Sequence, residues 1–148
     1  MPGPSPRACR AVAALALAAL TVAVTACGDG RKKVYPVRGV ILVDGKPASE
    51  CIIMFHPPAV DDPKRVMPFG QADADGKFAM CSYVNGDGAP EGEYVVTFEW
   101  RERSGLMKQN FDGPDRLKGK YANPKKSEFR VKVEKQPMDL PPFELKSK

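Results

Sequence analysis

Histidine and tryptophan each occur once in the 148 residues, and no apolar run after residue 26 is long. A single histidine excludes a metal site built from several histidines. A Ser-His-Asp triad would depend entirely on His56, which follows the inward-facing Phe55 at the end of a predicted strand and should therefore lie on the surface. The sequence thus assigns no catalytic residue, no metal ligand and no cofactor.

Long helices and a strong excess of one charge are also missing. Fifteen prolines and thirteen glycines interrupt the chain too often for long helices. Without residues 1–26, which carry two arginines, 21 basic residues face 18 acidic ones, a net charge of +3. This balance is not typical of proteins that bind nucleic acid. We therefore expect an all-β protein that does not bind nucleic acid.

The longest uncharged apolar stretch lies at the N-terminus. Residues 11–26 carry no charge and follow Arg7 and Arg10, the layout of a secretory signal. The stretch is shorter than the roughly 20 residues that a membrane-spanning helix needs. It ends in Val24-Thr25-Ala26-Cys27, which resembles the lipobox of bacterial lipoproteins.

The lipobox resemblance implies cleavage between Ala26 and Cys27 and lipid attachment at Cys27. The cysteine would carry a diacylglyceryl group, and its new amine a fatty acyl group such as palmitate. Several acyl chains suffice for stable anchoring. We therefore expect a signal peptide at 1–26, a lipidated polar tether at 27–33, and a location on the exported side of the bacterial cell envelope. The alternative is a secreted protein cut at Ala26, with Cys27 a free thiol.

The remaining residues, 34–148, show the period-two alternation of β-strands. In "EYVVTFEWR", Tyr94, Val96, Phe98 and Trp100 share one face, and "FRVKVEK" repeats the pattern. The segment "VRGVILVDGKPASECIIMFHPP" predicts a hairpin that turns at residues 44–47, and "FGQADADGKFAM" predicts a second that turns at 74–76. "PPFELK" predicts a closing strand.

About seven such strands, with turns roughly every ten residues, predict an antiparallel β-sandwich. Its core should contain Ile41, Ile53, Phe55, Phe78, Tyr94, Val96, Phe98, Trp100 and Val131.

Several of these segments together resemble a known family. "YPVRGVILVDGKPASECIIMFHP", "DADGKFAM", "PEGEYVVTF", "KYANPKKS" and "LPPFEL" are similar, in order and spacing, to the transthyretin-like, carboxypeptidase regulatory-like domains that occur as small bacterial lipoproteins. The resemblance covers residues 35–146. It implies a seven-stranded, prealbumin-like sandwich of immunoglobulin-like architecture, and it implies no reaction.

Two surfaces are candidates for partners. Val40 and Leu42, with Ile52 and Met54, fall on the outer face of the first predicted hairpin and would form one apolar patch. The alternative is that the connection at 102–127 covers this patch through Leu106, Met107 and Phe111.

The second surface is basic. Residues 101–126 hold eight Lys or Arg against three Asp or Glu, and the lysines at 118, 120, 125 and 126 would contact a polyanion. The alternative is that these charged side chains are solvated and bind no partner.

The cysteines and the acidic turn suggest no further site. Cys51 should face inward and Cys81 outward, so they should not form a disulfide. Aligned on "DADG", an EF-hand loop would have Gln71 and Ser82 in place of its first Asp and its last Glu, and a hairpin turn accounts for the stretch better.

We therefore expect a non-catalytic binding or structural module, with an envelope protein or a polysaccharide as its partner. The alternatives are a carboxylate-dependent hydrolase and a carbohydrate- or polyanion-binding accessory module. Inward-facing Tyr94 and Trp100 leave no visible aromatic platform for a sugar.

Overall fold

The computed structural model describes residues 30–58, 62–103 and 112–148, so Ala26 and Cys27 lie outside the described residues. Within them the protein is all-β, as expected, and contains no helix that could cross a membrane. The strands are β1 (Val34–Tyr35), β2 (Val37–Val43), β3 (Lys46–Pro47), β4 (Ile52–His56), β5 (Phe69–Gln71), β6 (Lys77–Ala79), β7 (Ala89–Pro90), β8 (Gly92–Glu99), β9 (Arg130–Val133), β10 (Met138–Asp139) and β11 (Phe143–Leu145).

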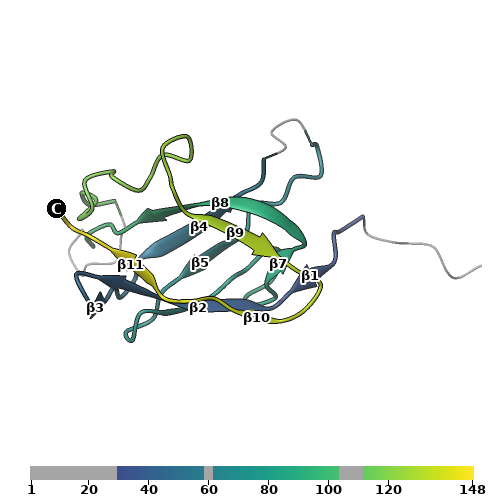
Figure 1. Cartoon of the computed structure of the whole chain (residues 1–148), viewed down its shortest axis with the longest axis horizontal. Helices are drawn as coiled ribbons and strands as arrows, with labels where there is room; N and C mark the ends of the chain where they lie inside the picture. The colour runs from purple at the N-terminus through teal and green to yellow at the C-terminus, as the bar shows by residue number, and fades with distance from the viewer. Residues whose placement is uncertain (1–29, 59–61, 104–111) are drawn as a thin grey trace, which may run out of the picture. The chain divides into compact units, whose positions relative to one another are not determined.

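The first sheet is built around β2 (Figure 1). Strands β6 and β3 pair antiparallel with β2, whereas β10 and β11 pair parallel with it. The expected sheet was wholly antiparallel. The difference arises because the chain leaves the other sheet after β9, turns at residues 134–137, and then runs in the same direction as β2.

The second sheet has the order β5-β4-β8-β9, with antiparallel neighbours throughout. The predicted hairpin between residues 37–43 and 52–56 is therefore wrong, because β2 and β4 lie in different sheets. The turn at 44–47 does form, and β3 pairs back with the end of β2. A second turn then redirects the chain: the N–H of Cys51 donates to the carbonyl of Ala48, and Glu50 has a φ of 67°.

The predicted turn at residues 74–76 forms, but the predicted hairpin at residues 69–81 forms only in part, because β5 pairs with β4 and β6 pairs with β2. The N–H of Asp73 donates to the carbonyl of Lys77, and the Asp73 carboxylate accepts the N–H groups of Asp75 and Lys77 at 2.9 Å each. Phe69 and Cys81 exchange two backbone hydrogen bonds at the open end. Because β5 belongs to the second sheet and β6 to the first, this hairpin joins the two sheets along one side.

The inner faces of the two sheets form one core. Eight of the nine predicted core residues are buried, and Trp100 is half-buried against them. The rings of Phe98 in β8 and Phe143 in β11 lie 5.1 Å apart and join the two layers. The architecture is therefore that of a two-layered, sandwich-like all-β protein.

The connection at 102–127 contributes to this core in a way that alternation did not indicate. Leu117 is fully buried, although no periodic pattern marks it. The carboxylate of Asp115 orders the segment by accepting the N–H groups of Trp100, Leu117 and Gly119 at 2.8–3.0 Å. Leu106, Met107 and Phe111, which were considered as a cover for the apolar patch, lie outside the described residues.

Candidate functional site

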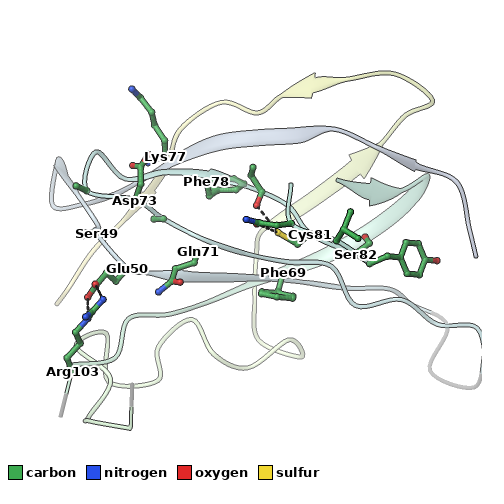
Figure 2. A pocket seen from close by; sticks show the side chains of 16 residues that line it. Ser49, Glu50, Phe69, Gln71, Asp73, Lys77, Phe78, Cys81, Ser82 and Arg103 are labelled. Carbon is green, nitrogen blue, oxygen red and sulfur yellow. Dashed lines mark hydrogen bonds and ion pairs between the residues drawn. The ribbon is translucent and has the colours of Figure 1, made fainter. Parts of the chain in front are cut away.

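A hollow in the described surface lies on the outer face of the hairpin formed by β5 and β6 (Figure 2). Its volume is about 980 Å³. Phe78 is buried beneath the hairpin, so the alternate residues point outward and form the floor: Phe69, Gln71, Asp73, Lys77, Ala79 and Cys81. Residues 49–50 with Arg103 lie at one end and residues 82–85 at the other.

Two large apolar side chains are strongly exposed in the hollow. Phe69 is 53% exposed and Val84 is 61% exposed, and these are the two exposed large hydrophobic residues of the described part of the chain. Single exposed apolar residues are ordinary on protein surfaces. Their occurrence together, in one concave region, is typical of a binding surface.

The loop that carries Val84 is held by Asp87. Its carboxylate accepts the N–H groups of Ser82, Tyr83 and Val84 at 2.7–3.1 Å. Burial raises the pKa of Asp87, but these hydrogen bonds lower it by more, so the pKa lies below its ordinary value of 3.8. The Ser82 hydroxyl also donates to the carbonyl of Gly88 at 2.7 Å. The loop therefore presents Val84 from an ordered backbone.

The opposite end of the hollow is formed by an ion pair. Arg103 donates from both its Nε and Nη2 atoms to the carboxylate of Glu50. Glu50 itself has a positive φ, which is unfavourable for a residue other than glycine, asparagine or aspartate. Next to it, the indole N–H of Trp100 donates to the carbonyl of Ser49 at 2.8 Å. The only tryptophan of the chain is thus hydrogen-bonded to the wall of the hollow.

The charged groups of the hollow already have partners, whereas several neutral ones do not. Besides the Glu50–Arg103 pair, Lys77 lies 3.5 Å from Asp75, and the Asp73 carboxylate accepts backbone N–H groups. Among the described residues, the side-chain amide of Gln71 and the hydroxyl of Ser49 have no hydrogen-bond partner. Asn85 uses its Oδ1 atom with Cys81 and leaves its NH₂ group available.

The sequence-predicted apolar patch is divided by the fold. Val40 and Leu42 lie on the outer side of β2, and Ile52 and Met54 on the outer side of β4, in the other sheet. All four are half-buried. They therefore do not form one surface, because the hairpin that would have placed them side by side does not exist.

The four lysines of the basic segment are all exposed. Lys118 has a φ of 53°, and Lys120 donates from Nζ to the carbonyl of Lys148 at 3.0 Å. Lys125 and Lys126 lie in a turn whose backbone N–H groups bond to Asn123. The C-terminus brings Lys148 to the same surface, which the sequence pattern did not indicate.

His56 and the two described cysteines differ in accessibility. His56 is half-buried, and its Nε2 atom lies 2.8 Å from the hydroxyl of the buried Thr97. Burial lowers the pKa of His56 below 6.5, and the charge of Arg65 lowers it further. Cys51 and Cys81 are both free thiols, as expected. Burial, with a smaller contribution from Asp115, raises the pKa of Cys51 to about 12, so its thiol is unreactive in the folded state.

Within the described residues, no three His, Cys, Asp or Glu side chains come together as a metal site. A carboxylate-dependent hydrolase would need two available carboxylates in one pocket. The hollow contains Glu50 and Asp73, each held by the partners described above.

Sequence reasoning did not identify this hollow. Alternation indicated that Phe78 and Met80 face inward, and the same parity would have placed Phe69, Gln71 and Cys81 outward. The residues at 49–50, 82–85 and 103 come from other segments, and their meeting depends on the register of β4 with β5. No local pattern carries that information.

Comparisons with known proteins do not assign this chain to a family. No family model and no curated protein matches it. Among solved structures it is similar to a DUF3823 family protein from Parabacteroides merdae ATCC 43184, at 11% identity, a TM-score of 0.37 and coverage of 78% of this chain and 46% of that one.

It is also similar to a 9R-lipoxygenase from Cyanothece PCC8801, at 14% identity and a TM-score of 0.38, over 95% of this chain and 21% of the other. The chain thus spans less than half the length of either structure. Both TM-scores are below 0.5, so neither likeness carries an argument about function.

Proposed function

We propose that this protein is a lipid-anchored lipoprotein of the bacterial cell envelope that presents a non-catalytic binding domain. In this proposal residues 1–26 are a signal peptide, Cys27 carries the lipid, and residues 27–33 tether a transthyretin-like sandwich. The binding surface is the hollow over the β5–β6 hairpin. One observation carries this assignment: the two strongly exposed large apolar side chains, Phe69 and Val84, line the same hollow.

The geometry of the hollow favours binding over catalysis. Exposed apolar side chains gain free energy when a partner removes them from water, at about 25 cal/mol per Å². An ordered loop lowers the entropy that must be lost on binding, and the Asp87 hydrogen bonds supply that order. The carboxylates, by contrast, are engaged in holding the backbone or an arginine.

The anchor is tested by the intact mass of the protein purified from membranes of its host, beside a Cys27→Ser variant. The expected result is a chain that begins at Cys27 and is heavier by a diacylglyceryl group, with this added mass absent from the variant. An unmodified soluble chain would overturn the anchor and favour a secreted binding module.

The binding surface is tested in living cells with a photocrosslinking residue at position 69 or 84. A matched control carries it at position 40, on the outer side of β2. We expect crosslinked species from positions 69 and 84 and few from position 40. Equal yields from all three positions, or none, would show that the hollow is not the binding surface.

A further inference from the structure

We propose that the hollow over the β5–β6 hairpin binds a neutral oligosaccharide chain, an inference that rests on the proposed binding function of this surface. It follows from the combination of an exposed aromatic ring with neutral hydrogen-bonding groups that lack partners. The sequence alone indicated no aromatic platform, because Tyr94 and Trp100 face inward. The structure supplies one in Phe69.

The ring of Phe69 provides the apolar contact. The C–H faces of a pyranose ring are apolar and flat, and they pack against an aromatic ring that is open to solvent. Phe69 is on the floor of the hollow and more than half exposed. Its register opposite Met54 fixes it on the outer face of the sheet.

The hydrogen-bonding groups around this ring match hydroxyls rather than ions. Gln71 lies two residues along the same strand face and is seen between Glu50 and Phe69 in Figure 2. Its amide, the hydroxyl of Ser49 and the NH₂ of Asn85 are without partners among the described residues. Amides and hydroxyls both donate and accept, which is what a sugar hydroxyl requires.

The charges of the hollow argue for an uncharged ligand. Two acidic and two basic side chains line it, so they balance, and Glu50 pairs with Arg103. A charged ligand would have to displace these internal partners, whereas a neutral chain leaves them intact. The volume of about 980 Å³ lies near the upper end of ligand pockets, which suits several sugar units.

The test uses the full chain in detergent and the fluorescence of Trp100, which is unique in the sequence and hydrogen-bonded to Ser49. The probes are the neutral hexasaccharides of β-1,4-glucose, α-1,4-glucose and β-1,4-mannose, and a charged hexamer of galacturonate. We expect at least one neutral probe to change the fluorescence saturably. The charged probe should have no such effect.

Two variants and one control locate the site. Phe69→Ala should weaken binding of the neutral probe about tenfold or more, because its ring no longer leaves water on binding. Gln71→Ala should also weaken it, whereas Gln136→Ala, which removes an exposed amide on another turn, should not. Circular dichroism and thermal unfolding check that each variant is folded.

The two sets of experiments distinguish failure of the carbohydrate assignment from failure of the proposed binding function. No response to any neutral probe, tighter binding of the galacturonate hexamer, or equal binding by Phe69→Ala would overturn the carbohydrate assignment. If photocrosslinks from positions 69 and 84 then join a protein, the hollow is a binding surface for a protein instead. If these crosslinks are missing as well, the proposed function itself is wrong.

Discussion

At the scale of single residues, the carboxylate of Asp87 determines the shape of the loop that presents Val84. It accepts three backbone N–H groups that no other described side chain satisfies. This makes Asp87 a structural requirement of the candidate site, although its carboxylate is turned toward its own loop.

Replacing Asp87 by Ala should lower the free energy of unfolding at pH 7 by about 1.5–3 kcal/mol, the range for hydrogen bonds to a charged group. The pKa of Asp87 is lower in the folded state than its ordinary value of 3.8. Its stabilisation is therefore complete above the unfolded-state pKa and is lost as the pH falls through the folded-state pKa. Denaturant unfolding between pH 2 and 7 measures this dependence.

The control is Asp75→Ala, because the Asp75 side chain is exposed and lies 3.5 Å from Lys77. This change should cost less than about 1 kcal/mol. A difference between wild type and the Asp87 variant that stays constant down to pH 2 would contradict the role of the carboxylate.

The same loop contains two glycines that should respond differently to substitution. A Cβ atom on Gly88, at a φ of 104°, would lie 1.8 Å from the carbonyl oxygen of Tyr35, whereas one on Gly86, at a φ of 74°, would meet no atom within 4 Å. Gly86→Ala should therefore cost only the backbone strain of about 1–2 kcal/mol. Strand β1 pairs antiparallel with β7, which follows Gly88 directly. Gly88→Ala should therefore cost about 3 kcal/mol or more, because the backbone at Tyr35 must move away. Equal free energies of unfolding for the two variants would contradict this close approach.

At the scale of elements, the fold separates strands that are adjacent in sequence. β2 and β4 belong to different sheets, and their outer residues face solvent on different layers. Residues more than about 7–10 Å apart with no shared partners usually contribute additively to stability.

A double-mutant cycle tests this separation. Leu42→Ala and Met54→Ala should be additive within about 0.5 kcal/mol in their effect on the free energy of unfolding. Met54 and Thr97 are paired across β4 and β8, so a cycle between them should show a larger coupling. Strong coupling between residues 42 and 54 would contradict this separation and would favour the single hairpin that the sequence pattern predicted.

Alternation along the chain predicted which side chains face the core, but it did not predict which strands pair. Val96 and Phe98 are buried as expected, because burial of one strand face is a local property. The pairing of β2 with β11 joins residues about 100 positions apart and leaves no local pattern. Leu117 was missed for the same reason, since an irregular segment has no period from which to read its burial.

At the scale of the whole molecule, the remaining sequence-based hypothesis concerns charge. The lysines at 118, 120, 125 and 126 are exposed and belong to the segment that precedes β9. In Figure 1 the C-terminus, which Lys120 contacts, lies at the far end of the domain from β1. This basic surface would bind a polyanion by charge.

Changing these four lysines to Ser alters the net charge of residues 27–148 from +3 to −1. Binding of the chain without its lipid, as residues 27–148 with Cys27→Ser, to anionic vesicles should fall when the four lysines are changed and should fall without that change as salt rises, because screening weakens exposed charges. Sedimentation with vesicles measures both effects. Equal binding by the two proteins would show that the lysines are ordinary solvated surface. The control for folding is a melting temperature that the four changes leave unaltered.

The parallel pairing of β2 with β11 also bears on how the chain acquires its structure. Strand β2 lies near the start of the domain and β11 at its end. Pairings between distant segments close large loops and slow the folding of small domains. The edge of β2 that pairs with β11 is therefore uncovered until the last strand of the domain has formed. A chain stopped before residue 143 would expose that edge and be prone to aggregate.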